Sequence, residues 1–287
     1  MLNAIIPTKN PGRFIYKTVD DLLQNRFINK VFVIDQSDNV ELKFFSERIK
    51  HVKTKKPKSA ISARAMGAKL ASDETGITGL LFVDDDIKIL SGEKDFILIL
   101  SLLKNGNAVS FTIPQVHSKF LIFIKFIIER TLKKGVYYDD RIVRNLYLII
   151  KKKFRLNTLS VSAGAMALPV NYCINGAMNL IKCRGYPIQA GDLELAQEIY
   201  LKYNKKFIAS NSFIAVHPPY DYKIADTKLY ISRYDTKNIL RKYNTVSYHY
   251  WLVCLNDIFN ALAHSVVRMS MEPLFVCLNS ISNPQSH

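Results

Sequence analysis

Short apolar runs alternate with amphipathic segments through the first third of the chain. The apolar runs occupy residues 2–6, 31–34 and 80–83, and a weaker extended segment surrounds Val52. Between them, apolar residues recur at helical spacing within residues 15–23 and 61–70. Such runs are typical of strands buried on both faces, whereas that spacing is typical of amphipathic helices. The alternation therefore predicts an α/β fold in which helices cover a mostly parallel sheet on both faces.

Polar residues stand at the carboxyl ends of these apolar runs. Pro7-Thr8 follows the first run, Asp35 the second, and Asp84-Asp85-Asp86 the last. In open sheets of this kind, ligands bind beyond the carboxyl ends of the strands. We therefore expect polar groups from three separate strands to meet at one edge of the sheet and to form a binding site.

The rest of the chain divides into the second half of this domain and a helical tail. Residues 191–203 have the pattern of a helix, and residues 207–216 alternate as a strand does. We predict an α/β domain over residues 1–225, with a basic and apolar insertion near residues 115–157. A helical C-terminal extension is predicted over residues 226–287.

The acidic run at residues 84–86 is the most distinctive chemical feature. Three neighbouring carboxylates repel one another unless a cation neutralises them. Carboxylate oxygens are ligands that Mg²⁺ and Mn²⁺ prefer, and either ion could bridge such a run to a diphosphate. A solvated acidic turn is the alternative interpretation.

Several segments, in order along the chain, resemble the inverting glycosyltransferases of family 2, which have the GT-A fold. The resemblance covers about residues 2–220. The matching segments are Ile5-Ile6-Pro7-Thr8, Val33-Ile34-Asp35, Ser62-Ala63-Arg64-Ala65-Met66-Gly67, Leu81-Phe82-Val83-Asp84-Asp85-Asp86, Ser162-Ala163-Gly164-Ala165-Met166, Gly191-Asp192-Leu193-Glu194-Leu195 and Val216-His217. The fold that the resemblance implies is a GT-A-like three-layer α/β/α sandwich.

The resemblance also implies how the chain would bind a nucleotide-sugar donor. Pro7 and Thr8 would line the nucleotide pocket, and Asp35 would bind the base through an N–H of its ring. Arg64 would approach the diphosphate, because a guanidinium offers phosphate a planar fork of donors. Asp84 would contact the ribose.

The remaining matches concern the donor, the metal and the chemistry. Asp85 falls in the same nucleotide-sugar-binding group as Asp84. Asp86 and His217 would hold Mg²⁺ or Mn²⁺, which would stabilise the departing diphosphate. Asp192 would be the general base that takes the proton from the acceptor hydroxyl.

Two positions depart from the family pattern, and three of the assignments have structural alternatives. Gly191 stands where the family usually has Glu, and Ala65 stands where its Ala-Arg-Asn motif has Asn. Arg64 could instead be an exposed helix residue, Asp192 a helix N-cap and His217 a turn residue.

The function implied by the resemblance is transfer of a sugar from a UDP- or dTDP-sugar to a hydroxyl of a glycan or lipid-linked glycan. Such a reaction would serve the synthesis of a surface polysaccharide. Two alternatives remain at this point: a nucleic-acid-binding protein that uses a basic surface, and a non-catalytic binding protein with the GT-A fold.

The net charge of +16 favours a polyanionic partner. The sequence has no zinc-finger spacing and no RNP-like run, so no nucleic-acid partner is expected. Its basic clusters, such as residues 151–153, flank an apolar helix predicted at residues 120–128. This combination is typical of peripheral contact with an anionic membrane, although the same helix could belong to the core of the insertion. Oligomeric state is left open.

The expected location is the cytoplasm, at the inner face of the cell membrane. The first residues lack the basic start and long apolar stretch of a secretory signal. The four cysteines have neither paired nor zinc-ligand spacing, which is typical of reduced thiols.

Overall fold

The computed structural model describes residues 1–12, 14–38, 40–55, 60–112, 156–158, 164–173 and 191–216, with a few positions between 258 and 278. The elements are β1 (Leu2–Thr8), α1 (Phe14–Leu23), β2 (Ile28–Asp35), β3 (Ile49–Lys53), α2 (Ala60–Ser72), β4 (Gly79–Val83), β5 (Lys88–Ile89), α3 (Glu93–Lys104), β6 (Val109–Thr112), β7 (Leu156–Thr158), β8 (Ala165–Pro169), α6 (Val170–Tyr172), α8 (Gly191–Tyr203) and β9 (Phe207–Val216).

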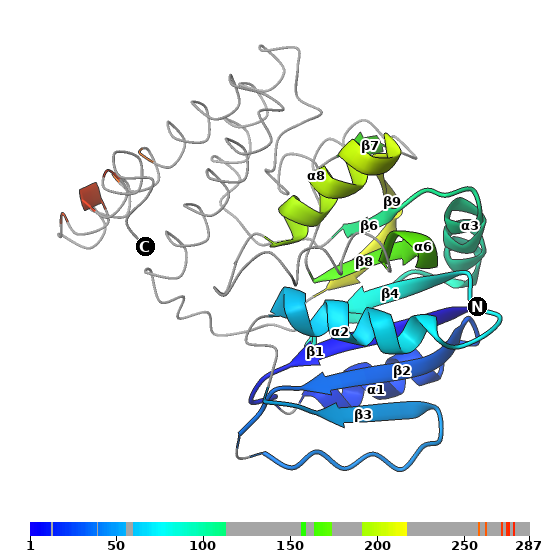
Figure 1. Ribbon diagram of the computed structural model, residues 1–287, viewed down its shortest axis with the longest axis vertical. Helices are drawn as coiled ribbons and strands as arrows, with labels where there is room; N and C mark the ends of the chain where they lie inside the picture. The colour runs from blue at the N-terminus through cyan, green and yellow to red at the C-terminus, as the bar shows by residue number, and fades with distance from the viewer. Residues whose placement is uncertain are drawn as a thin grey trace. The chain divides into compact units, whose positions relative to one another are not determined.

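The strands in the described part of the chain form a mixed sheet, with the order β3-β2-β1-β4-β8-β6-β9-β5 and with β7 on β9 (Figure 1). The pairs β1·β2, β1·β4, β2·β3 and β6·β9 are parallel, and β8 is antiparallel to both β4 and β6. It follows that β1, β2, β3, β4, β6 and β9 all run in one direction. Their carboxyl ends therefore lie along one edge of the sheet.

Helices cover both faces of the sheet because its strands are apolar on both sides. Alternate strand residues such as Ile6 and Val33 belong to one core cluster, together with apolar residues of α1 and α3. The intervening residues, such as Ile5 and Ile34, belong to a second cluster with α2, α6 and α8. Successive side chains of a strand point to opposite faces of the sheet, and this alternation separates the two clusters. The result is the three-layer α/β/α arrangement that the sequence predicts.

The predicted α/β class is confirmed, and several predicted elements are present with small changes of length. The runs at residues 31–34 and 80–83 lie in β2 and β4, and the predicted helix and strand after residue 190 are α8 and β9. β1 continues past Pro7 to Thr8. Proline has no N–H to donate, but β4 pairs with β1 only over residues 2–5, so no bond is lost to β4 at Pro7.

The chain separates into two compact units. One unit contains Met1–Pro187 and Leu195–Pro219, and the other contains Ile188–Glu194 and Tyr220–His287. The predicted boundary at residue 225 and nearly all of the predicted insertion and C-terminal extension lie outside the described residues. Within the described residues, no helix combines the length and the apolar character that a membrane span requires.

Candidate functional site

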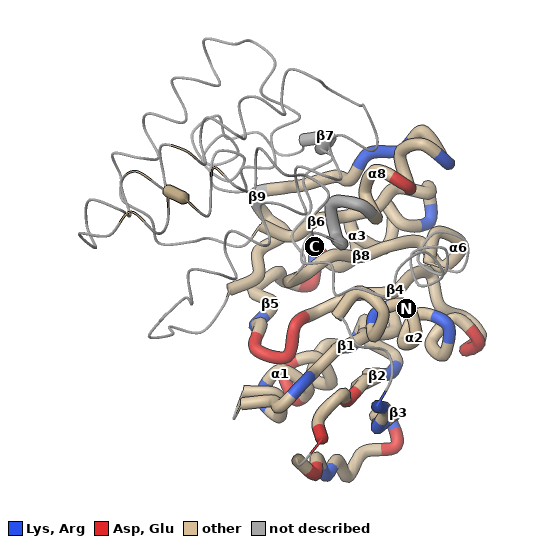
Figure 2. The backbone as a smooth tube through the Cα atoms, turned by 60° about the vertical axis from the view of Figure 1, so that its left-hand side comes forward, with Lys and Arg blue, Asp and Glu red and all other residues tan. Residues whose placement is uncertain are grey.

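The candidate site lies where the strand order reverses at β1. The chain passes from β1 through α1 to β2 on one side, whereas β4 pairs with the other side of β1. Thr8 ends β1, and the acidic run at residues 84–86 directly follows β4. Figure 2 shows this run as a red segment that leads into β5. A crevice at such a reversal is a common ligand site in open α/β sheets.

Asp85 points back toward β1 and α1. Thr8 donates a hydrogen bond from Oγ1 to Asp85 Oδ2, and Thr18 Oγ1 donates to the Asp85 carbonyl oxygen at 3.2 Å. Burial raises the pKa of Asp85 to about 6, the hydrogen bond from Thr8 offsets part of the increase, and the negative charges of Asp86 and Asp84 add to it. The three carboxylates therefore concentrate negative charge at the end of β4.

Asp84 forms an ion pair with Arg64. Arg64 belongs to α2, is only 5% exposed and donates from Nη2 to Asp84 Oδ1. The alternative in which Arg64 is an exposed helix residue is therefore wrong. Asp84 is 31% exposed, so a ligand can reach the carboxylate while the guanidinium holds it from the core side.

Backbone hydrogen bonds hold the acidic run in a defined turn. The Asp84 N–H donates to the Gly164 carbonyl oxygen at 2.9 Å, and the Ile87 N–H donates to the Asp84 carbonyl oxygen at 3.3 Å. Gly164 lies in the matching segment at residues 162–166, directly before β8. The first bond holds Gly164 against the start of the acidic run, and the second fixes the path of the backbone between β4 and β5.

The end of β9 lies beside the residues that follow the acidic run. Val216, the last residue of β9, pairs with Lys88 of β5, two residues after Asp86. Ser91 Oγ also accepts the Ile214 N–H at 3.0 Å. His217, a predicted metal ligand, lies outside the described residues.

The donor set at the acidic run fits Mg²⁺ or Mn²⁺. Asp84 and Asp86 are both partly accessible, and a cation would relieve the repulsion among the three carboxylates, which adds to the effect of burial on the pKa of Asp85. Among the described residues, no three His, Cys, Asp or Glu side chains are grouped as metal ligands. Mg²⁺ commonly takes only one or two carboxylates from the protein and further oxygens from a phosphate ligand.

Asp35 is fully buried at the end of β2. Its Oδ1 accepts the Ser37 N–H at 2.8 Å, and its Oδ2 lies 3.2 Å from Nε2 of His51 in β3. The Asn10 N–H donates to Ser37 Oγ at 2.8 Å, and the Thr54 N–H donates to the Asp35 carbonyl oxygen at 2.8 Å. Asp35 therefore ties together the segments that follow β1, β2 and β3. Its predicted contact with a base stays a prediction.

The structure brings together some of the predicted residues and adds others. Arg64 meets Asp84, and Thr8 meets Asp85 beside Pro7, which is buried in β1. Thr18, Ser37 and His51 also contact the predicted residues. These three act through contacts with residues distant in the sequence or through a backbone N–H, so local patterns carry no signal for them.

Asp192 is the second residue of α8. Its side chain lies outside the described part of the chain, as do Ser162 and Ala163. Its role as a general base and the alternative role as an N-cap therefore both stay predictions.

Neither a protein-family model nor a curated protein matches the sequence. Among solved structures, the mannosyltransferase PcManGT from Pyrobaculum calidifontis in complex with GDP-Man and Mn²⁺ matches with a TM-score of 0.56 and 11% sequence identity. The match covers 100% of this chain and 76% of that chain. A likeness at this identity concerns the fold. The chain therefore has an α/β fold that it shares with a solved mannosyltransferase.

Proposed function

We propose that this protein is a metal-dependent glycosyltransferase that moves a sugar from a nucleoside diphosphate to a hydroxyl acceptor. The observation that carries the proposal is the clustering of Thr8, Arg64 and the run at residues 84–86 where the strand order reverses. The fold is that of a mannosyltransferase solved with GDP-Man and Mn²⁺, so both ligand classes have a precedent on this architecture.

The donor would bind at the ends of β1, β2 and β4. Arg64 would turn part of its guanidinium to the diphosphate, since it already lies against the acidic run from the core side. Asp84 would accept hydrogen bonds from the ribose hydroxyls, and the base would lie toward the end of β2, where Asp35 is. The predicted donor classes are UDP- and dTDP-sugars, and the matched mannosyltransferase adds GDP-sugars as a class to test.

Asp86 and His217 are the proposed ligands of Mg²⁺ or Mn²⁺. The pairing of Val216 with Lys88 supports this choice, because it sets the residue before His217 beside the chain that leaves the acidic run. The ion, once bound, would supply positive charge to the diphosphate as it leaves.

Asp192 is the proposed general base. It would accept the proton of the acceptor hydroxyl while that oxygen bonds to the anomeric carbon and the bond from this carbon to the diphosphate oxygen breaks. One displacement of this kind inverts the anomeric centre. Gly191, where the family has Glu, removes a second negative charge from beside the base.

A glycan or lipid-linked glycan is the proposed acceptor, in the synthesis of a surface polysaccharide at the inner face of the cell membrane. Support comes from the sequence, in which basic clusters flank the apolar residues 120–128. Lysines near anionic headgroups and apolar side chains at the acyl boundary would hold the enzyme beside such an acceptor.

Calorimetric titration with UDP, dTDP and GDP, each with and without Mn²⁺, tests the proposal. We expect metal-dependent binding of at least one nucleotide. Asp86→Ala should remove the metal-dependent gain, about tenfold or more in Kd. Asp73→Asn is the matched control, because it removes a carboxylate from an exposed turn that is not part of the site.

The opposite result would be binding of none of the three nucleotides. If the protein then bound RNA or DNA tightly and in a salt-sensitive way, the result would contradict the proposed function and support the alternative of a nucleic-acid-binding protein that uses its basic surface. Binding of a nucleotide without turnover, in an assay that offers sugar donors and glycan acceptors, would favour the non-catalytic alternative.

A further inference from the structure

The carboxylate predicted to read the nucleobase has no exposed surface. The Asp35 side chain has 0% exposure, whereas the side chain of His51 beside it is 24% exposed. One Asp35 oxygen accepts the Ser37 N–H and the other faces His51 Nε2. Of the two side chains, only the imidazole has exposed surface.

The protonation of the pair follows from its contacts. Burial of Asp35 opposes its ionisation, but hydrogen bonds from Ser37 and His51 and the attraction of His51 outweigh this effect and lower the pKa of Asp35. The ionised carboxylate accepts hydrogen bonds only, so His51 Nε2 carries the hydrogen. A neutral ring with its hydrogen on Nε2 has Nδ1 as an acceptor, whereas a charged ring carries hydrogens on both nitrogens and has no acceptor. No hydrogen bond to Nδ1 occurs within the described residues.

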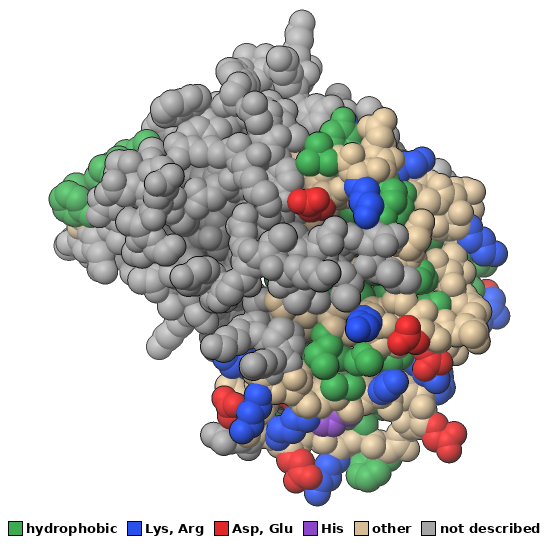
Figure 3. All heavy atoms as spheres, viewed as in Figure 1, with side chains coloured by type: hydrophobic (Ala, Val, Ile, Leu, Met, Phe, Trp, Pro, Cys, Tyr) green, Lys and Arg blue, Asp and Glu red, His purple; other side chains and the backbone are tan. Residues whose placement is uncertain are grey.

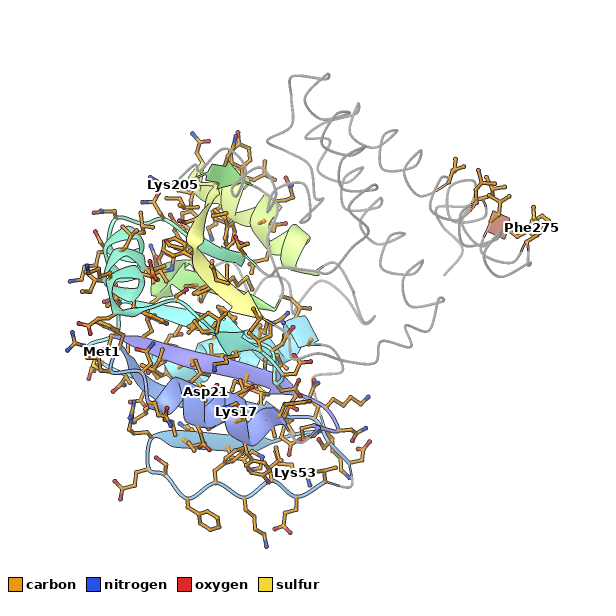
Figure 4. The ribbon with its side chains drawn as sticks, turned by 180° about the vertical axis from the view of Figure 1, so that it is seen from behind. Met1, Lys17, Asp21, Lys53, Lys205 and Phe275 are labelled. Carbon is orange, nitrogen blue, oxygen red and sulfur yellow. The ribbon has the colours of Figure 1, made fainter. Side chains whose placement is uncertain are left out.

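The ring of His51 is held in a fixed orientation. Phe44 meets it edge to face, with 5.5 Å between ring centroids and 77° between planes, and Tyr16 of α1 packs on Phe44 at 5.5 Å. The loop that carries Phe44 is tied to the end of β3 by Lys53, labelled in Figure 4, whose Nζ donates to the Val40 carbonyl oxygen at 3.0 Å. These contacts therefore fix the direction in which Nδ1 of His51 points.

We propose that His51 is the specificity-determining residue of the donor site, and that it accepts an N–H from the edge of the nucleobase. Asp35 acts through His51 as a positioning residue. Uracil, thymine and guanine each present a ring N–H that suits an acceptor nitrogen. The inference rests on the proposed function, because it concerns the base of the same donor.

The first test uses His51→Gln in the full-length chain. A glutamine amide can take the place of Nε2 and donate to Asp35, which keeps that buried carboxylate paired, but it has no nitrogen at the position of Nδ1. We expect the Kd of the preferred nucleoside diphosphate to rise about 3- to 10-fold. The Kd values of UDP, GDP, CDP and ADP should therefore differ less from one another in the variant than in the wild type. Binding of inorganic pyrophosphate with Mn²⁺ should stay within about twofold of the wild type.

Pyrophosphate has no base, so its binding tests the donor site independently of the proposed contact with His51. If His51→Gln leaves the spread among the four bases unchanged while pyrophosphate binds normally, the inference is overturned and the donor site stands. If it weakens pyrophosphate and all nucleotides by the same factor, His51 is only structural and the inference is likewise overturned. If the wild type binds neither pyrophosphate nor any nucleotide, the proposed function fails and the inference fails with it.

A second measurement uses the wild-type protein alone. Wild-type protein labelled with ¹⁵N in its histidine rings is titrated with the preferred nucleotide and Mg²⁺, which avoids the line broadening of Mn²⁺. We expect the Nδ1 resonance of His51 to shift with the nucleotide and to stay in place with pyrophosphate. An Nδ1 resonance that does not respond to the nucleotide would refute the contact.

Discussion

The three consecutive aspartates have three different environments. Asp84 meets a buried guanidinium, Asp85 receives hydrogen bonds from Thr8 and Thr18, and Asp86 lies between Asp85 and the start of β5. Three like charges at one strand end can remain together only if the surroundings compensate them. Arg64 compensates Asp84, whereas among the described residues hydroxyl and backbone groups contact Asp85. Burial and the neighbouring charges therefore raise the pKa of Asp85.

Asp85→Asn should stabilise the metal-free protein at high pH and not at low pH. The pKa of Asp85 rises from 3.8 to about 6 in the folded state, so the folded protein binds the proton more tightly than the unfolded chain. The free energy of unfolding of the wild type therefore falls as the pH rises from about 4 to about 6. Asparagine cannot ionise, yet it can still accept the hydrogen bond from Thr8.

Thermal unfolding in the presence of a chelator measures this effect. The Tm of Asp85→Asn relative to the wild type should be higher at pH about 8 than at pH about 4.5, and saturating Mn²⁺ should reduce the difference at high pH. Asp73→Asn is the control for loss of one surface charge. An Asp85→Asn effect of equal size at both pH values would contradict the argument.

At the scale of elements, helix α2 lies unusually close to the sheet because of one glycine. A Cβ placed on Gly67 would lie 2.5 Å from Ile5 Cγ2 and 3.1 Å from Ile34 Cγ1. Both contact atoms belong to β-branched side chains on buried strands, so neither can move away easily. The close approach also sets Arg64, one turn earlier in α2, against the end of β4.

Overpacking in Gly67→Ala should cost about 1–3 kcal/mol, and the roughly 0.5–1 kcal/mol that alanine gains in helix propensity should offset only part of this cost, so that stability falls. Chemical denaturation measures this loss. Gly12→Ala is the matched control, because a Cβ there would have no atom within 4 Å, and its effect should stay within about 0.5 kcal/mol. If Gly67→Ala were as stable as Gly12→Ala, the helix could move away from the sheet, and the close approach would not hold Arg64 in place.

Arg48 shows how a single side chain joins three elements. Its guanidinium donates to the carbonyl oxygens of Leu23, Ile28 and Asn29, with 2.9 Å to Leu23 and 3.0 Å to Asn29. These carbonyls lie at the end of α1 and the start of β2. The loop before β3 is thereby fixed at one end by Arg48 and near its other end by Lys53. This anchoring keeps Phe44 against His51.

At the scale of the whole molecule, the net charge of +16 is unevenly distributed along the sequence. In the view of Figure 3, basic and acidic side chains are interspersed over the described surface. The dense clusters at Lys133-Lys134 and Lys151-Lys152-Lys153 lie outside the described residues. Long-range attraction to an anionic surface should therefore depend on these clusters more than on the described α/β unit.

Replacing these five lysines by alanine should weaken binding to anionic vesicles by about 100-fold or more, since each lysine near such a surface contributes about 1 kcal/mol. Vesicle sedimentation at low and high salt measures the effect, and neutral vesicles give the baseline. The matched control replaces five exposed lysines of the described unit, namely Lys43, Lys69, Lys94, Lys202 and Lys205. Equal losses in both variants would mean that net charge, and not the clusters, drives the contact.

Local patterns were sufficient for much of the fold. The helix at residues 191–203 and the strand at residues 207–216 have the predicted bounds, and the buried runs became β1, β2 and β4. Local patterns do not predict helix α3, because residues 96–103 are apolar on nearly all sides and show no distinct apolar face. The strands β5 and β7 are short, so their alternation carries little signal.

The sequence by itself determined the α/β class, the succession of the first strands and helices along the chain, and the placement of Thr8, Asp35 and the acidic run at strand ends, because periodicity and strand ends are local properties. Only the tertiary structure decided which polar groups meet. Arg64 and Asp84 are 20 residues apart, and Thr8 and Asp85 are 77 apart. The burial of Asp35 behind His51 likewise depends on the register of β3 against β2. Strand order and register bring such residues together, and neither is encoded in a local pattern.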